Sequence, residues 1–166
     1  MKMKLYFLKN LFFFLLLLVI FSESSFSQTL PDFKMKMTNG KVFSKADISH
    51  KKPTIIIYFA PDCEHCQVLV KQLFQNMNTF KNTDIVMVTF ESLNDIAGFE
   101  KQYQISKYPN IKVGVETPVF FFKNYYQLEH TPFTALFNKN GKLMVSYKDY
   151  TPVGELMKWV KAIEKK

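Results

Sequence analysis

The sequence predicts an α/β protein with one folded domain. Residues 54–60 and 84–90 are unbroken runs of β-branched and aromatic side chains, which is typical of strands buried on both faces of a sheet. Apolar residues recur at helical spacing after each run, so a helix is expected after each strand. The chain has 166 residues, of which 48% are hydrophobic and 22% are charged, which fits one ordinary domain and excludes a disordered chain.

Turn and capping residues place the elements along the chain. First, we expect a β-hairpin over 33–43 around Thr38-Asn39-Gly40, a strand over 54–60 and a helix that begins at Cys63 with Asp62 as its cap. A strand over 84–90 follows, then a helix capped by Ser92 and Asp95 and a short helical segment after Thr117-Pro118. The chain is expected to end with a strand over 134–138, a turn at Asn140-Gly141, a strand over 142–147 and a last helix after Thr151-Pro152. Between residues 104 and 116, a strand and a loop are both consistent with the sequence.

Each predicted helix has an apolar face that we expect to pack on the sheet. The residues of these faces are Cys66, Leu69, Val70, Leu73 and Met77, then Ile96, Phe99 and Tyr103, then Phe120, Phe121 and Tyr125, and finally Leu156, Trp159, Val160 and Ile163. The third set is interpreted as core, because aromatic residues at helical spacing more often fill a core than bind a cofactor.

Residues 1–27 are expected to be a secretory signal peptide and not part of the fold. Lysines precede an apolar run at 11–21, and small residues follow it, so cleavage is expected near Ser27-Gln28. A retained membrane anchor is the alternative, but residues 5–21 are shorter than the ~20 apolar residues that span a bilayer. We therefore expect an exported, periplasmic domain over 28–166, which contacts the membrane only if the first segment is retained.

The positive charge gives little support for nucleic-acid binding. All 22 basic residues are lysine, so the chain lacks the arginine that binds phosphate or guanine through two parallel hydrogen bonds. Three of the lysines and one of the 14 acidic residues precede position 28, which leaves +6 of the formal charge of +8 on the mature domain. These lysines are scattered, so we expect a solvated surface and no nucleic-acid partner.

The motif with specific chemistry is Cys63-Glu64-His65-Cys66. Two cysteines at this spacing, directly after a buried strand and at a predicted helix start, indicate a redox-active dithiol. Unpaired N–H groups and the helix dipole favour negative charge in the first turn, so Cys63 is expected to react as the thiolate. Cys66 is expected to resolve the mixed disulfide. A protonated His65 would support the thiolate and Glu64 would oppose it, whereas a surface histidine with no role is the alternative.

The cysteine pair has four other possible interpretations. An inert disulfide with a two-residue spacer would close a very short loop and would stabilise the fold little. A closed zinc site needs four ligands, and the chain has two cysteines and three histidines, so we expect no resident metal. An exported Cu(I)-binding protein using the same thiols stays open as the alternative function. A thiol peroxidase is disfavoured, because Ala60 stands where the Thr-x-x-Cys pattern of that class requires a threonine.

A second informative motif is Thr131-Pro132, directly before the strand predicted over 134–138. A proline here marks a point where the chain turns and presents bare backbone. Only ~5–6% of X–Pro bonds are cis, so the sequence alone does not predict a cis bond.

Together these segments resemble the thioredoxin fold. The resemblance is carried by TIIIYFAPDCEHC and the helix after it, and by HTPFTALFNKNGKL further along the chain. The upstream stretch LPDFKMKMTNGKVFSKADI is similar to the N-terminal hairpin of the TlpA/ResA-like redoxins, which are exported thiol–disulfide oxidoreductases. The match covers roughly residues 30–163 and implies a central mixed β-sheet flanked by helices.

The resemblance implies roles for four residues. Cys63 would be the nucleophile and Cys66 the resolving thiol. Pro132 corresponds to the family's cis-proline, which lies against the cysteine motif, and Thr131 would pair its backbone with the substrate peptide. The implied partners are protein thiol or disulfide clients and a redox partner protein, and no cofactor is expected.

Two positions depart from the family pattern. Ile57 and Leu69 stand where relatives carry an acidic residue, so Glu64 or a water molecule is expected to accept the proton of Cys66. The direction of electron transfer stays open. A histidine before the second cysteine resembles the exported oxidases, whereas the N-terminal hairpin resembles the reductases.

Overall fold

The structure is a computed structural model that describes residues 28–165, and the predicted signal peptide lies outside the described residues. Its strands are β1 (Lys34–Lys36), β2 (Val42–Ser44), β3 (Thr54–Tyr58), β4 (Asp84–Thr89), β5 (Ile111–Thr117), β6 (Phe133–Phe137) and β7 (Leu143–Lys148). Its helices are η1 (Lys45–Asp47), α2 (Glu64–Gln75), α3 (Met77–Phe80), α4 (Leu93–Gln102), η2 (Ile105–Lys107), α5 (Phe121–Tyr126) and α6 (Val153–Glu164).

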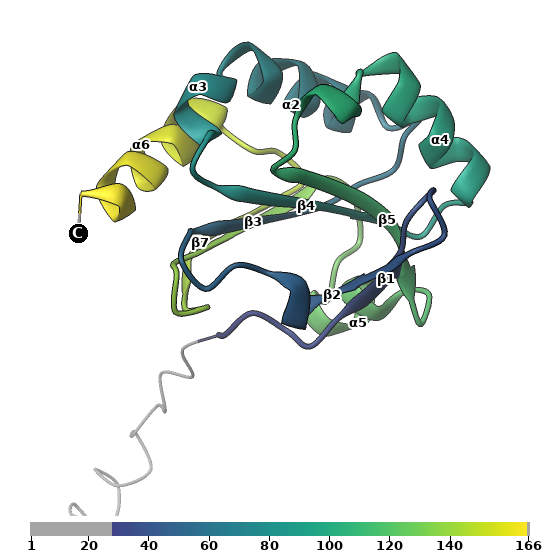
Figure 1. Cartoon of the computed structure of the whole chain (residues 1–166), viewed down its shortest axis with the longest axis horizontal. Helices are drawn as coiled ribbons and strands as arrows, with labels where there is room; N and C mark the ends of the chain where they lie inside the picture. The colour runs from purple at the N-terminus through teal and green to yellow at the C-terminus, as the bar shows by residue number, and fades with distance from the viewer. Residues whose placement is uncertain (1–27, 166) are drawn as a thin grey trace, which may run out of the picture.

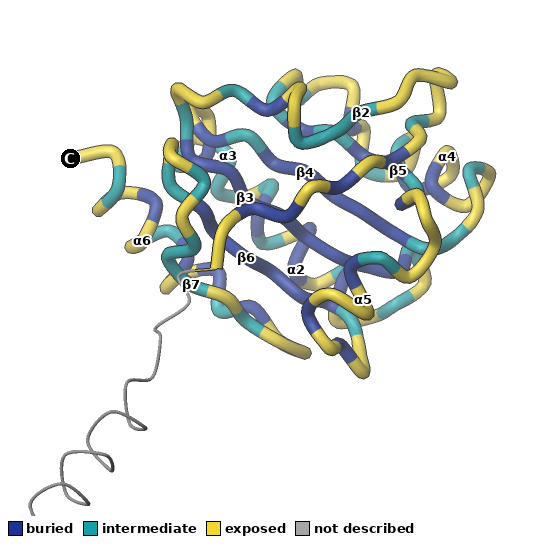
Figure 2. Tube along the Cα trace, turned by 90° about the horizontal axis from the view of Figure 1, so that it is seen from below, coloured by how far each residue is buried: buried dark blue, intermediate teal, exposed yellow. Residues whose placement is uncertain are grey.

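The strands form one mixed sheet in the order β2-β1-β5-β4-β3-β6-β7. The three central strands β5, β4 and β3 are parallel, while β6 and β7 on one side and β1 and β2 on the other are antiparallel to their neighbours. Every residue of β3 is buried, which confirms the prediction from its unbroken apolar run. Figure 2 shows the buried strands through the middle of the molecule.

Helices cover both faces of this sheet (Figure 1). On one face lie α2, α3, α4 and α6, which pack on side chains such as Ile55, Ile57 and Met87. On the other face lies the short helix α5, which packs on Tyr58, Val88 and neighbouring side chains. Adjacent strand residues point to opposite faces, so Ile57 and Tyr58 belong to different cores.

Residues 104–116, where the sequence is consistent with a strand or a loop, contain a strand. Residues 105–107 form η2, and β5 follows, pairing with β4 and with β1. A glycine is needed at position 114 of β5 for steric reasons. A Cβ atom there would lie 2.9 Å from the Lys36 carbonyl oxygen and 2.9 Å from Met35 Cγ. The hairpin β1–β2 thus packs against the sheet at a point where only glycine fits.

Several sequence predictions are confirmed. The two hairpins form at the predicted turns, and Gly40 and Gly141 have the positive φ angles of 78° and 74° that these turns require. Ser92 caps α4, because its hydroxyl accepts the Asp95 backbone N–H at 3.2 Å. The Asp95 carboxylate in turn accepts the Ser92 backbone N–H, which completes a capping box.

Two predictions, one about α2 and one about α6, are wrong. Asp62 does not cap the first helix, because α2 starts at Glu64 and Cys63 itself is the capping residue. Trp159 is 39% exposed, since the buried face of α6 is formed by Val153, Leu156 and Val160.

The register of α5 also differs from the prediction. Phe120 and Tyr125 are 44% and 46% exposed, and Phe121 is half-buried. The buried residues are Phe122 and Tyr126, spaced by one helical turn. The physical reason is that helix periodicity selects one face, and a segment that is aromatic throughout does not reveal which.

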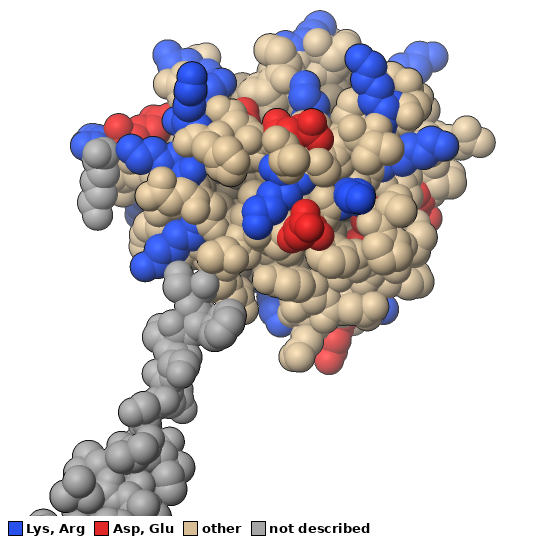
Figure 3. Space-filling model, turned by 60° about the horizontal axis from the view of Figure 1, so that its bottom comes forward, with Lys and Arg blue, Asp and Glu red and all other residues tan. Residues whose placement is uncertain are grey.

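Charged side chains are interspersed over the surface. Figure 3 shows lysines and acidic residues mixed on one face of the molecule. Within residues 28–165, no helix has the length and the apolar composition needed to cross a membrane.

Candidate active site

The cysteine motif lies where β3 ends and α2 begins. The chain leaves β3 at Tyr58, passes Pro61, and turns into α2 with Cys63 as the residue before its first turn. The Cys66 backbone N–H donates to Cys63 Sγ at 3.2 Å. The sulfur therefore occupies the place that a serine or aspartate oxygen takes in an ordinary helix cap, where N–H groups and the helix dipole favour an anion.

The two thiols are unbridged and differ in accessibility. Cys63 is half-buried, whereas Cys66 is fully buried against the helical core. Burial raises the pKa of the Cys66 thiol to about 12, and its hydrogen bond with the Cys63 thiol acts in the same direction. The arrangement thus provides one sulfur that a partner molecule can reach and one that is held protonated behind it.

Thr131-Pro132 reaches the same place from the other end of the chain. Its peptide bond is cis, as the resemblance implies, and Pro132 is buried. The Cys63 thiol donates to the Thr131 carbonyl oxygen at 3.5 Å, across 68 residues of sequence. The structure therefore brings together Cys63, Cys66, Thr131 and Pro132, the residues that the sequence singled out.

Glu64 and His65 lie in the first turn of α2 and are both exposed. They stand between the two cysteines, at the rim of the site. Their expected influence on the thiols stays a prediction.

The proton acceptor expected by resemblance is absent from its usual positions. Ile57 and Leu69 are both buried in the core on the cysteine side of the sheet. Among residues 28–165, the acidic residue that is fully buried is Glu116 in β5, which is 1% exposed and contacts the opposite core. Sequence analysis missed Glu116, because an acid in a strand normally signals a solvent-facing position and only tertiary contacts bury it.

Glu116 accepts three hydrogen bonds. Tyr58 Oη donates at 2.9 Å, and the backbone N–H groups of Phe120 and Phe122 donate at 2.8 Å each. Burial raises the pKa of the Glu116 carboxyl, and these hydrogen bonds offset part of the effect. Burial and the bond to Glu116 also raise the pKa of Tyr58, so its hydroxyl stays a donor.

Two clefts of about 460 Å³ each flank the cysteine motif. One, which we call the acidic cleft, is lined by Asp62, Glu91 and Asp95 among others. The other, which we call the aromatic cleft, is lined by Tyr58, Phe90, Phe120, Lys123, Leu128, Glu129, His130 and Thr131. Thr131, which helps to line the aromatic cleft, is also the residue whose carbonyl accepts the Cys63 thiol.

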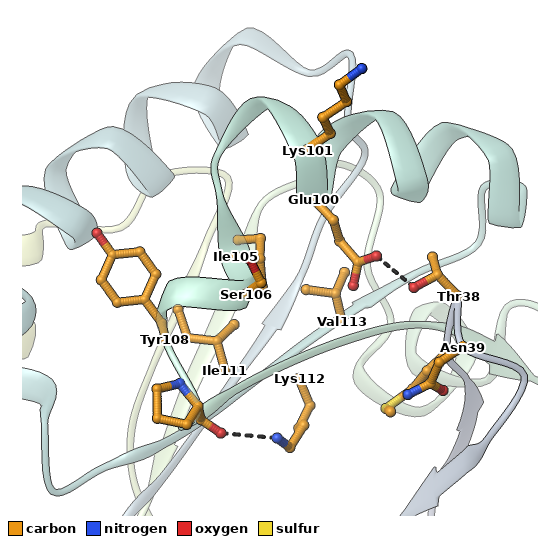
Figure 4. A pocket seen from close by; sticks show the side chains of 12 residues that line it. Thr38, Asn39, Glu100, Lys101, Ile105, Ser106, Tyr108, Ile111, Lys112 and Val113 are labelled. Atoms are coloured by element: carbon orange, nitrogen blue, oxygen red, sulfur yellow. Dashed lines mark hydrogen bonds between the residues drawn. The ribbon is translucent and has the colours of Figure 1, made fainter.

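A further cleft of about 430 Å³ lies away from the cysteines (Figure 4). It separates the β1–β2 turn from α4, and Thr38 donates across it to Glu100 at 2.6 Å. None of the predicted site residues lines this cleft. The described part of the chain contains no cluster of three or more histidine, cysteine or acidic side chains arranged to hold a metal ion.

Comparisons with known proteins agree with this geometry. Residues 41–164 match the family model of the thioredoxin-like domain. No match was found among curated proteins. The solved structures with the same fold include a thiol:disulfide interchange protein of the thioredoxin family from Chlorobium tepidum TLS, at 20% identity and a TM-score of 0.68, over 84% of this chain and 98% of that chain.

Two further solved structures have a similar sequence identity, coverage and TM-score. A secreted disulfide oxidoreductase of Mycobacterium tuberculosis, homologous to E. coli DsbE, has 17% identity and a TM-score of 0.64, over 79% of this chain and 96% of its own. The exposed lipoprotein thioredoxin of Streptococcus pneumoniae TIGR4 has 19% identity and a TM-score of 0.60, over 80% of this chain and 99% of its own. The predicted fold, a mixed sheet flanked by helices, is confirmed, and the stated resemblance to the redoxins agrees with these neighbours.

Proposed function

Since the chain belongs to the family of thioredoxin-like domains, we propose that it is a thiol–disulfide oxidoreductase that uses Cys63 and Cys66. One observation carries the proposal: the half-buried Cys63 sulfur accepts a backbone N–H at the start of α2, with the buried Cys66 thiol one helical turn further along. This is the arrangement that a nucleophilic thiolate and a resolving thiol require.

In the reducing direction, the Cys63 thiolate attacks one sulfur of a client disulfide. A Cys63–client disulfide forms, and the other client sulfur leaves as a thiolate. Cys66 then loses its proton and attacks Cys63 Sγ, which forms the Cys63–Cys66 disulfide and releases the second client thiolate. Two electrons pass from the dithiol to the client, so no cofactor is needed, and the oxidising direction is the same sequence in reverse.

The raised pKa of Cys66 makes its deprotonation the demanding step. We propose Glu64 or a water molecule at the exposed rim as the acceptor of this proton. Holding Cys66 protonated until a client is bound prevents its thiolate from competing with Cys63 for the client sulfur.

We propose that the protein acts outside the cytoplasmic membrane, in the periplasm, after cleavage of the predicted signal peptide near Ser27-Gln28. The support is the sequence pattern of residues 1–27 and the secreted neighbour with the same fold. Its partners there would be client proteins with cysteines and a redox partner protein that restores the dithiol or the disulfide.

Two single-cysteine variants test the proposal. Cys63→Ser should abolish reduction of insulin disulfides, because the attacking sulfur is removed. Cys66→Ser should also stop turnover. Insulin reduction at the wild-type rate by Cys63→Ser would refute the proposed roles.

Cu(I) binding by the same two thiols is the competing function, since thiolates are preferred Cu(I) ligands. Stoichiometric Cu(I) uptake by the reduced protein, without any dithiol exchange, would favour it. The direction of exchange is read from the reduction potential of the cysteine pair. A value near −270 mV, as in thioredoxin, indicates a reductant, and one near −120 mV indicates an oxidant.

A further inference from the structure

The aromatic cleft is assembled from four parts of the chain, one of which, Thr131, contacts Cys63. Tyr58 and Phe90 come from the ends of β3 and β4, Phe120 comes from the start of α5, and Thr131 comes from the cis peptide. Its volume of about 460 Å³ falls in the range of sites that hold a small ligand or a few side chains.

Three aromatic rings pack against one another along this cleft, and Tyr58 is the buried member of the set, with 1% of its surface exposed. The ring centroids of Tyr58 and Phe90 are 5.8 Å apart, and those of Phe90 and Phe120 are 5.5 Å apart. Phe120 is 44% exposed although it follows a buried strand and precedes a buried helix face. An exposed aromatic ring at a concave surface is a typical anchor for a partner's apolar side chain, and Phe120 is the exposed ring of the three.

Hydrogen bonds to the buried Glu116 hold two residues of this cleft in place. Its Oε1 accepts the Tyr58 hydroxyl and the Phe120 backbone N–H, so one buried oxygen links β3 to the start of α5. Its Oε2 accepts the Phe122 N–H in the buried face of α5. The rings are therefore fixed before a partner arrives, which lowers the entropic cost of binding.

Two exposed side chains of opposite charge, Lys123 and Glu129, line the cleft. Lys123 Nζ lies 5.6 Å from the centre of the Phe120 ring, and the exposed His130 follows Glu129 in the chain. The one ion pair in residues 28–165 joins Lys158 and Glu155, so the Lys123 ammonium is available to a partner. The acidic cleft, in contrast, is lined by Asp62, Glu91 and Asp95 and by no lysine.

We propose that the aromatic cleft binds an aromatic side chain of the client, next to the client cysteine, with a client carboxylate near Lys123. The inference rests on the proposed function. A client sulfur that reaches Cys63 lies beside the Thr131 carbonyl, which is 3.5 Å from Cys63 Sγ. Residues next to the client cysteine then lie over the cleft that Thr131 helps to line.

The test uses short peptides whose single cysteine is disulfide-bonded to glutathione. The peptides carry Phe or Ala two residues before or after the cysteine, with Glu or Gln beside that position, and kcat/KM is measured for each with the reduced full domain. We expect the better-placed Phe peptide to exceed its Ala counterpart about five- to tenfold, the effect of one well-placed aromatic contact. Exchanging Glu for Gln should lower kcat/KM about twofold at low salt.

Two variants locate the effect. Phe120→Ala should reduce the Phe-to-Ala ratio to near one. Tyr125→Ala is the matched control, because Tyr125 lies on the same helix with 46% exposure and does not line the cleft, so its ratio should stay that of the wild type. Lys123→Gln, at an exposed position, should remove the Glu preference even if Phe120→Ala fails to fold.

Different failures are distinguishable. Equal wild-type rates with the Phe and Ala peptides, or an equal loss of the ratio in Tyr125→Ala, would overturn this inference and leave the exchange chemistry intact. Absence of reaction with glutathione disulfide and with every peptide would overturn the proposed function itself.

Discussion

The two faces of the sheet are built in different ways. On the cysteine face, α2, α4 and α6 pack on the sheet through regular apolar stripes, and the buried Cys66 belongs to the same core. On the opposite face, the six-residue helix α5 is held by an acid, Glu116, and by closely packed aromatic rings. The difference suggests a division of labour, with exchange chemistry on the helical face and client recognition where the aromatic face reaches the thiols.

The largest expected contrast concerns the thiols themselves. In the reduced native protein, iodoacetamide at pH 8 should label Cys63 and spare Cys66, because burial raises the pKa of Cys66 from 9 to about 12 and excludes the reagent. The thiolate fraction alone slows Cys66 about a thousandfold relative to an ordinary thiol. Mass spectrometry of the labelled peptides measures the rates, with urea-unfolded protein as the control. Equal labelling in the native protein would contradict the division between the two sulfurs.

The second contrast lies within α5. Phe122→Ala should lower the free energy of unfolding by about 3–5 kcal/mol, because it opens a cavity in the core. Phe120→Ala should cost about 1 kcal/mol or less, because the ring is 44% exposed. Urea denaturation of both variants checks the pair. Equal losses would mean that the register of α5 is not the one described.

The third prediction concerns Glu116. Glu116→Ala leaves two backbone N–H groups and the Tyr58 hydroxyl without their acceptor, so the loss should be about 2–3 kcal/mol. Glu116→Gln retains an acceptor oxygen and should lose less. An equal loss in both variants would indicate that the carboxylate's hydrogen bonds are not what stabilises α5.

The same residue gives the aromatic face a pH dependence. Burial raises the pKa of Glu116 in the folded state above its unfolded value, so the folded protein holds this proton more tightly. The contribution of Glu116 to stability is therefore complete below the ordinary carboxyl pKa and is lost as the pH rises through the raised value. Unfolding curves recorded from the ordinary carboxyl pKa upward should show this decline in the wild type, and Glu116→Gln should lack it.

The smallest predicted effect lies on the helical face. Ser92→Ala removes the cap of α4 and should destabilise the protein by about 1 kcal/mol. Ser146→Ala, an exposed serine of β7, is the control and should change the midpoint little. A loss in Ser146→Ala equal to that in Ser92→Ala would show that the capping box adds nothing.

The difference between the two faces of the sheet also explains which features the sequence predicts. Elements of the helical face were predictable, because the uniform apolar run of β3 and the Ser92 cap are local signals. The α5 face was not, because its aromatic residues have no polar face to set a register and Glu116 becomes a core residue only through partners in β3 and α5.

The site shows the same limit. Cys63, Cys66 and Pro132 were identified from motifs, but the capping role of Cys63 was assigned to Asp62, since a thiol is an uncommon helix cap. The aromatic cleft could not be predicted, because its walls come from segments that meet only after folding.

The most direct test of the central claim is intact-mass analysis of Cys66→Ser after reaction with a disulfide-bonded client peptide. The account predicts one peptide half attached through a disulfide at Cys63, and no such adduct on Cys63→Ser. An adduct that forms equally on Cys63→Ser, or none on Cys66→Ser, would contradict the assignment of Cys63 as the attacking sulfur.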